Sequence, residues 1–280
     1  MPIIDDHAHL QPIGSRSEAV GRFKKAGGTH LVVSHATFGL RPIFTKEDWR
    51  KDYQFTLDLC EEAERETGVK VYCVVGPYPC DLFDFQHNSR ITAEKASEIM
   101  KLGVEVAAEL VKEQKAIGIG EVGRPHFPCD EQAMRMSNEI LISCMERAKD
   151  LGCPVVIHSE HANDRNLEEF TAMAEKVGMR PEKVVKHYCQ TLEESWPRGK
   201  ISLSVLATKE NVLSAIGQGL NFMMETDYLD DPSRPGAVLA LTTVPKRTKQ
   251  LFEEGAIDER LWRKIHIEMP KVAYGIDTSL

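Results

Sequence analysis

Short apolar runs alternate with helix-patterned segments eight times along this sequence of 280 residues. The runs are rich in β-branched residues, as at 31–33 and 155–157, and lack polar alternation, which is typical of strands buried on both faces. The segments between them carry apolar residues at helical spacing, and several end at a glycine, such as Gly68 and Gly152. Strands and helices that alternate in this way build a parallel sheet covered by helices.

The boundaries of these segments predict the architecture. We expect strands at residues 2–5, 29–35, 69–75, 116–120, 154–158, 183–187, 200–205 and 221–226. We expect helices at residues 15–26, 48–67, 92–114, 131–151, 167–177, 209–216, 237–254 and 258–274. Eight units predict an α/β fold, a closed, parallel, eight-stranded (β/α)8 TIM barrel with an extra C-terminal helix, as one domain over residues 1–280. A doubly wound open sheet is the alternative, but the glycine-rich turn that marks it is absent after the first strand.

Composition narrows the function classes. The formal net charge of −8 argues against a surface that coats polyanions, because nucleic-acid binders usually carry a clustered basic footprint. An acidic protein can still cut a phosphodiester where metal ions supply positive charge. The seven cysteines are scattered without a Cys-x-x-Cys pair, which fits a reducing cytosol. With no signal peptide and no long apolar run, we expect a soluble cytoplasmic protein with no membrane partner.

Metal-binding residue types follow the apolar runs directly. Residues i and i+2 of a strand point to the same side, so His7 and His9 can face one ion. In a barrel, the carboxyl ends of all strands converge on one face. The candidate ligands at the ends of strands one, four, five, six and eight are His7, His9, Glu121, His158, His187 and Asp227. This set suits one or two divalent ions, zinc first, with manganese, iron, cobalt, nickel or magnesium as alternatives.

These residues lie in motifs that resemble a known family. The motifs are His-x-His at 7–9, Gly-Glu-Val-Gly at 120–123, Val-Ile-His-Ser at 156–159, Lys-His-Tyr-Cys at 186–189 and Glu-Thr-Asp at 225–227. In this order they resemble the TatD-type metal-dependent hydrolases of the amidohydrolase superfamily. The segment Pro-Lys-Val-Ala-Tyr-Gly-Ile near the C-terminus also resembles that family's closing helix.

The resemblance implies a site of one or two metals and the hydrolysis of ester, amide or phosphoester bonds, with DNA hydrolysis associated with TatD-type members. The implied ligands are His7, His9 and Asp227 for one ion, His158 and His187 for the other, and Glu121 as a bridge. We expect the attacking group to be a metal-activated water whose proton Asp227 takes, with Glu121 as the second catalytic carboxylate.

Two departures from the family pattern lie near the expected substrate position. Residues 124–126 are Arg-Pro-His where TatD-type proteins commonly have Leu-Asp-aromatic, and residues 228–232 replace a common small-Pro-aromatic segment. The sequence therefore looks like a divergent branch, and the general chemistry transfers better than the substrate does. His35, Arg124 and His126 follow strand ends and are candidate substrate contacts, although they can equally be ordinary loop residues.

The proline-rich or irregular loops at 76–90 and 228–236 border the expected metals, so we expect them to set substrate choice. In the first loop, Phe83 and Phe85 can stack on a base or pack onto neighbouring helices. Asp5 shares the alternation of His7 and is a candidate hydrogen-bond partner of a ligating imidazole.

Three functions remain open from the sequence. The first is cleavage of phosphodiesters, with single-stranded nucleic acid as substrate, and the second is hydrolysis of a small lactone, amide or phosphotriester. The third is a non-catalytic barrel that binds a metal or ligand, which predicts a missing ligand or a replaced carboxylate. A basic groove would favour the first. The arginines available for it are Arg41, Arg90, Arg124, Arg165 and Arg234. We expect no obligate protein partner.

Overall fold

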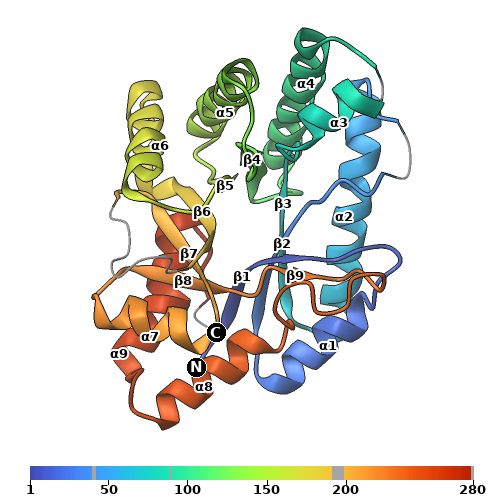
Figure 1. The fold of residues 1–280 in the computed structure, drawn as a ribbon. Coiled ribbons are helices and arrows are strands. Elements are labelled where there is room, and N and C mark those ends of the chain that lie inside the picture. Colours follow the sequence, from blue (N-terminus) through green and yellow to red (C-terminus); the bar gives the residue numbers. More distant parts are fainter. Residues whose placement is uncertain (40–41, 89, 191–198, 279–280) are drawn as a thin grey trace.

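The computed structural model describes residues 1–39, 42–88, 90–190 and 199–278 (Figure 1). The strands are β1 (Ile4–His9), β2 (His30–Ser34), β3 (Lys70–Val75), β4 (Gly118–Gly123), β5 (Val155–His158), β6 (Val184–Cys189), β7 (Ser202–Leu206), β8 (Phe222–Glu225) and β9 (Tyr228–Leu229). All neighbours in the sheet are parallel, in the order β8-β7-β6-β5-β4-β3-β2-β1-β9. Because β9 follows β8 directly in the chain and pairs with β1, the two ends of the sheet meet. The predicted TIM barrel is confirmed.

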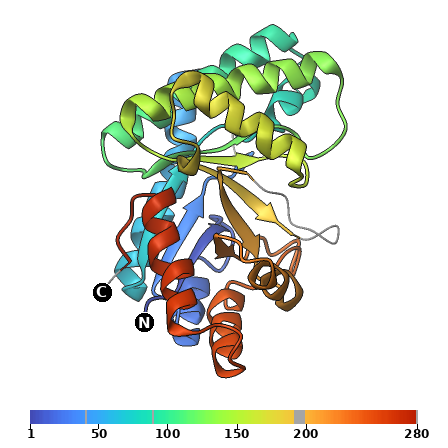
Figure 2. The same ribbon diagram turned by 90° about the vertical axis from the view of Figure 1, so that its left-hand side faces the viewer.

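Helices lie around the outside of this sheet (Figures 1 and 2). They are α1 (Ser17–Ala26), α2 (Lys46–Thr67), α3 (Asp81–Asn88), α4 (Ala93–Lys112), α5 (Glu131–Leu151), α6 (Asp164–Val177), α7 (Lys209–Gly217), α8 (Thr243–Glu253), α9 (Glu259–Arg263) and α10 (Met269–Ala273). A 3-10 turn (Pro181–Lys183) precedes β6, and a π-helical turn (Lys264–Glu268) joins α9 to α10. None of the described helices is both long and apolar enough to span a bilayer.

Capping residues explain where the long helices begin and end. Thr45 accepts a hydrogen bond from the backbone N–H of Asp48, and the Asp48 carboxylate accepts the N–H of Thr45, so α2 starts two residues earlier than the apolar pattern predicts. Asp130 caps α5 in a similar way. Gly68 and Gly152 end these helices with φ of 70° and 66°, a left-handed conformation that a side chain would disfavour.

The segment 76–90 contains a helix where we expected an irregular loop. In α3, Leu82 and Phe85 are buried three residues apart, and the Phe85 ring packs edge-on against Trp49 with 6.2 Å between centroids. Pro77 and Pro79 precede the helix and therefore do not interrupt it. The loop prediction was wrong because the prolines obscured a short amphipathic helix behind them.

Two apolar cores stabilise the barrel. The larger core lies between the sheet and the helices. The smaller core fills the barrel interior with residues from six strands, namely Ile4, Val32, Val74, Val156, Val185 and Met223. Tyr274 packs against this layer, and its hydroxyl donates to the carbonyl of Asp6 at 3.1 Å. The C-terminal segment thus contributes to the core of the barrel, as a packed barrel without a pore requires.

Three strands change their register where candidate ligands lie. The shifts fall between Asp5 and Ala8 in β1, between Ile119 and Val122 in β4, and between Lys186 and Cys189 in β6. A shift of this kind re-aims side chains and breaks simple alternation. Ile4 consequently packs inside the barrel, although strict alternation from His7 would place Ile3 there. The argument that Asp5 shares the orientation of His7 fails for the same reason.

His266 links the C-terminal helices to the first strand. Its ring is fully buried, its Nδ1 accepts the N–H of Ile4 at 3.3 Å, and its Nε2 lies 3.1 Å from Thr248 Oγ1. These contacts suit a neutral imidazole that accepts at Nδ1 and donates at Nε2. Burial lowers the pKa of His266 to about 3.

We predict that His266 makes the protein less stable in weak acid. Between pH 6.5 and 3 the unfolded chain binds a proton at this position that the folded chain excludes, so the free energy of unfolding falls as pH falls. The difference in free energy of unfolding between the wild-type protein and His266→Gln should fall by about 2 kcal/mol, to the disadvantage of the wild type, between pH 7.5 and pH 5. Urea unfolding at both pH values measures this, with the exposed His87→Gln variant as control. An advantage that does not change with pH would contradict it.

Candidate metal centre

The six candidate ligands meet at the carboxyl end of the barrel. Strand β1 supplies two of them, β4, β5 and β6 supply one each, and the last follows β8: His7, His9, Glu121, His158, His187 and Asp227. The side chains of Asp227 and His158 remain 15% exposed, whereas that of Glu121 is only 2% exposed. The cluster is therefore closed to solvent around Glu121 and open on the side of Asp227 and His158.

Glu121 lies between two pairs of histidines. Its Oε1 is 2.8 Å from His7 Nε2 and 3.1 Å from His9 Nε2. Its Oε2 is 3.0 Å from His158 Nδ1 and 3.5 Å from His187 Nε2. Each carboxylate oxygen thus faces a different pair, and the two groups of donors share one side chain. This is the arrangement that the family resemblance implied for a bridging carboxylate.

Asp227 belongs to the first of these groups. Its Oδ1 lies 3.3 Å from His9 Nε2 and 3.7 Å from His7 Nε2. Its backbone N–H donates to the carbonyl of His7 at 3.0 Å, and its φ of 47° is left-handed. A residue other than glycine adopts this conformation only when its surroundings hold it there. The strand end therefore holds this carboxylate toward the histidines, and it does not act as a simple loop cap.

The spacing and chemistry of these atoms fit divalent cations. Nitrogen ligands at about 2.0–2.1 Å from a tetrahedral zinc ion are roughly 3.4 Å apart, which matches the distances above. His9 donates through Nδ1 to the carbonyl of Ser34 at 2.9 Å, so Nε2 is the nitrogen that a cation would bind in place of a proton. The Nδ1 of His187 lies 3.7 Å from Glu225 Oε1 and faces away from Glu121. Both rings therefore present Nε2 to the cluster.

The electrostatics of the cluster favour a positive charge. Burial opposes ionisation of Glu121, but His187 and His7 hold its pKa well below the usual range. Burial, with the neighbouring His7, keeps the pKa of His187 well below 6.5, so this ring is neutral as a ligand must be. Burial also acts to lower the pKa of His9, yet Asp227 and Glu121 raise it to about 10. The position beside His9 thus attracts a cation.

Glu225 is a polar residue near the site that our sequence reasoning missed. It is fully buried, its Oε1 accepts the N–H of Tyr188, and its Oε2 lies 2.7 Å from Ser204 Oγ. Ser204 Oγ is also 2.7 Å from Asp6 Oδ1. Burial raises the pKa of Asp6 and Glu225 well above the usual range, so this network holds a carboxyl proton below the metal cluster. The sequence contained a signal for Glu225, because this residue precedes Asp227 by two positions, the same spacing as between His7 and His9.

Of the expected substrate contacts, His126 lies beside the cluster and His35 does not. His126 is exposed, and its Nδ1 is 3.0 Å from His158 Nε2. His35 is fully buried, with Nδ1 2.8 Å from Thr56 Oγ1 and Nε2 3.0 Å from Asp52 Oδ2. The expectation for His35 is corrected, because a fully buried ring with polar partners on both nitrogens has no surface for a substrate.

The expected substrate role of Arg124 is not supported either. Its Nε donates to Asn138 Oδ1 at 2.7 Å, and its terminal nitrogens lie 3.1 Å from Glu160 and 2.7 Å from Glu169. The guanidinium also lies over the Phe170 ring at 4.7 Å from its centroid. Arg124 is 4% exposed, so it ties α5 to α6 and does not face the barrel mouth.

A cavity of about 460 Å³ opens above the metal cluster. Both segments expected to set substrate choice line it, the first with Tyr78, Asp81 and Asp84 and the second with Leu229 and Arg234. The aromatic residues of the first segment pack elsewhere. Phe83 lies against Phe127, with 5.1 Å between ring centroids, and Phe85 lies in the core.

The mouth carries no basic groove among the described residues. Arg234 is the one lysine or arginine among the described residues that line the cavity, and it pairs with Asp231 at 2.7 Å. Arg165 pairs with Glu169 at 3.0 Å, Arg90 is exposed outside the cavity lining, and Arg41 lies outside the described residues. The arginines proposed for a polyanion track are therefore paired, not part of the cavity lining or not described.

The barrel and its cluster of histidines and carboxylates have the fold and the residue types that the resemblance to TatD-type proteins implied. A family model described as TatD related DNase matches residues 4–275, so the chain belongs to this family.

An uncharacterised protein of Methanocaldococcus jannaschii is 38% identical over 283 residues, covering 100% of this chain and 98% of that protein. A TatD homologue of Escherichia coli K12 has a TM-score of 0.60 at 16% identity, covering 98% of both chains. A TatD-like protein of Archaeoglobus fulgidus has a TM-score of 0.56 at 17% identity, covering 96% of this chain and 95% of that one. At these identities the two solved structures share the fold with this chain.

We predict that the cluster binds divalent metal. Protein incubated with zinc or manganese and then dialysed should retain bound ions, and His7→Ala combined with His9→Ala should lose at least one ion per chain because it removes two donors beside Glu121. Elemental analysis measures the content, and the exposed His87→Ala variant is the control. Wild-type protein that retains no metal after this treatment would rule out the site.

Proposed function

We propose that this protein is a metal-dependent hydrolase that cleaves phosphodiester bonds at the mouth of its barrel. The observation that supports the proposal is the position of Glu121, whose two oxygens face separate histidine pairs beside Asp227. Divalent cations bound to these residues would polarise the scissile bond and lower the pKa of the attacking water. Such a site needs no serine or cysteine nucleophile.

The residues of the chain have separate tasks in this proposal. Asp227 borders the cavity and is partly exposed, so its carboxylate can take a proton from the attacking water and return it to the leaving group. Glu121 is 2% exposed and its two oxygens face separate histidine pairs, so its task here is to hold the two donor groups together. His9 keeps its orientation through Ser34. A non-catalytic barrel would leave a ligand missing or a carboxylate replaced, and this cluster has neither defect.

A second candidate is the hydrolysis of a small lactone, amide or phosphotriester, and the charge of the cavity favours it. Asp81 and Asp84 line the mouth opposite a single arginine, Arg234. Burial raises the pKa of Asp81 to about 7, whereas Asp84 is exposed. A long polyanion would meet these carboxylates, whereas a cavity of about 460 Å³ can hold a small neutral molecule.

We predict that Asp227→Asn lowers kcat on the best substrate by at least about 100-fold, because the amide cannot accept the proton. Its circular dichroism should stay close to that of the wild-type protein, and both proteins are assayed at saturating metal, because Asp227 is also a candidate ligand. Asp150→Asn, an exposed substitution on α5, is the matched control and should leave kcat unchanged. Near-normal turnover by a folded, metal-loaded Asp227→Asn protein would contradict the assignment.

The two candidate substrates can be separated with metal-reconstituted protein and a panel of single-stranded DNA, a phosphodiester model, a lactone and an amide. We expect turnover of the phosphodiester model, and Arg234→Ala should raise KM for that anion several-fold while leaving KM for a neutral lactone unchanged. Activity confined to the lactone or amide would exclude the first candidate and support the second.

A further inference from the structure

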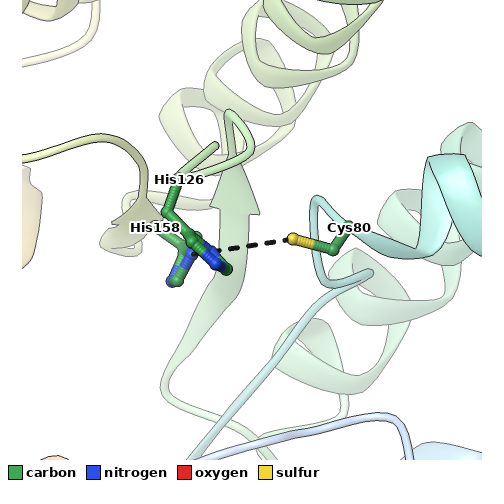
Figure 3. A group of neighbouring side chains, drawn as sticks. All are labelled: Cys80, His126 and His158. Carbon is green, nitrogen blue, oxygen red and sulfur yellow. Dashed lines mark hydrogen bonds between the residues drawn. The ribbon is translucent and has the colours of Figure 1, made fainter. Parts of the chain in front are cut away.

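His158 presents its two ring nitrogens to different neighbours. Its Nδ1 faces Glu121 and His187, both at 3.0 Å. Its Nε2 points the other way and lies 3.0 Å from Nδ1 of His126, and the sulfur of Cys80 lies 3.9 Å from that same nitrogen of His126 (Figure 3). A cysteine and a histidine thus meet the outer side of a candidate metal ligand.

We propose that Cys80, His126 and His158 form an additional divalent-metal site, which shares His158 with the donors around Glu121 and is selective for zinc or cobalt over magnesium and manganese. The three donor atoms lie within 4.8 Å of one another. A thiolate and two imidazoles select thiophilic ions, whereas the carboxylate-containing cluster also accepts harder ones. This inference goes beyond hydrolysis, since the hydrolytic reaction uses no thiol.

The spacing of the three donors supports the site. Bond lengths of about 2.3 Å to sulfur and 2.0–2.1 Å to nitrogen place tetrahedral ligands roughly 3.6 Å apart for sulfur and nitrogen and roughly 3.4 Å apart for two nitrogens. The observed separations of 3.9 Å and 3.0 Å differ from these by a few tenths of an ångström. His126 is exposed, so its ring has room to make that adjustment.

The position of the cluster also supports it. Cys80 precedes α3, His126 follows β4 and His158 ends β5, so an ion would tie together three segments around the mouth. Cys80 is half-buried and His126 is exposed, so a solvent ion has a path to the site. The hydroxyl of Tyr78 lies 3.3 Å from His158 Nε2 on the same side of the ring. Binding releases the thiol proton of Cys80 to solvent and requires His158 Nε2 without a proton. Where an ion also occupies the cluster around Glu121, His158 would bridge the two ions as an imidazolate, and its Nε2 proton would be released to solvent as well.

A hydrogen-bonded chain is the competing interpretation. His158 can donate from Nε2 to His126 Nδ1, which would orient His158 for the cluster around Glu121 without any further ion. In that case the thiol of Cys80 would have no part in metal binding. The two interpretations therefore differ in whether a cobalt ion contacts sulfur.

The test is reconstitution of the whole protein with cobalt, followed by near-ultraviolet absorption and metal content. A cobalt–thiolate contact produces a charge-transfer band that nitrogen and oxygen ligands do not produce, and the donors around Glu121 include no sulfur. We expect the wild-type protein to show the band, and Cys80→Ser to lose the band together with one ion per chain. Cys129→Ser is the matched control, because this half-buried cysteine lies close to His126 in sequence but outside the cluster, and it should keep both.

Two further variants separate this site from the hydrolytic one. His126→Ala, at an exposed position, should also lose the band and one ion. His7→Ala combined with His9→Ala should keep the band while losing metal from the other cluster, so the two proposals fail independently. Absence of the band from cobalt-saturated wild-type protein, or equal metal content in Cys80→Ser and Cys129→Ser, would overturn the additional site and leave the hydrogen-bonded chain.

Discussion

The structure depends on one buried charge, the carboxylate of Glu121. A carboxylate that is 2% exposed stays ionised only where partners compensate for the lost hydration, which otherwise costs several kcal/mol. Here His7 and His9 face one oxygen, while His158 and His187 face the other. These rings come from β1, β5 and β6, so the carboxylate is satisfied only when strands distant in sequence stand in one barrel. Closing the fold and assembling the candidate metal centre are therefore the same event.

Closure of the barrel rests on a second buried carboxylate, Asp5. It accepts the N–H and the hydroxyl of Thr226 at 3.1 Å and 2.7 Å, and it also accepts the N–H of His7 at 3.3 Å. Burial raises the pKa of Asp5 to about 7, although these hydrogen bonds act to lower it. Asp5 is thus bonded to the backbone of β1 and to the segment that joins β8 to β9. It fixes the place from which Asp227 extends toward the histidines, a different role from the imidazole partner that alternation suggested.

The sequence predicted the features that depend on local pattern. Eightfold alternation was enough for the barrel, and positions at strand ends were enough to select the six residues that meet at its mouth, because parallel strands place those ends together. The sequence did not predict the features that depend on contacts between residues far apart in the chain. The register shifts around His7, Glu121 and His187 reset which side chains face inward. Arg124 follows a strand end as a substrate contact would, but its partners lie on α6 and elsewhere, at positions that no local pattern marks.

The charge at the mouth distinguishes the two proposed classes of substrate. Without cations, the mouth presents the carboxylates of Asp84, Glu121 and Asp227 against Arg234, which is paired with Asp231, and His9, whose pKa Asp227 and Glu121 raise, so the balance of charge disfavours an anion. Divalent ions at the cluster would more than neutralise Glu121 and Asp227, and the sign of the local potential would then reverse. For the proposed phosphodiester substrate, this charge balance requires the metals to bind first, whereas a neutral lactone or amide has no such requirement. The order of binding, set by these few charges, is the physical difference between the two candidate functions.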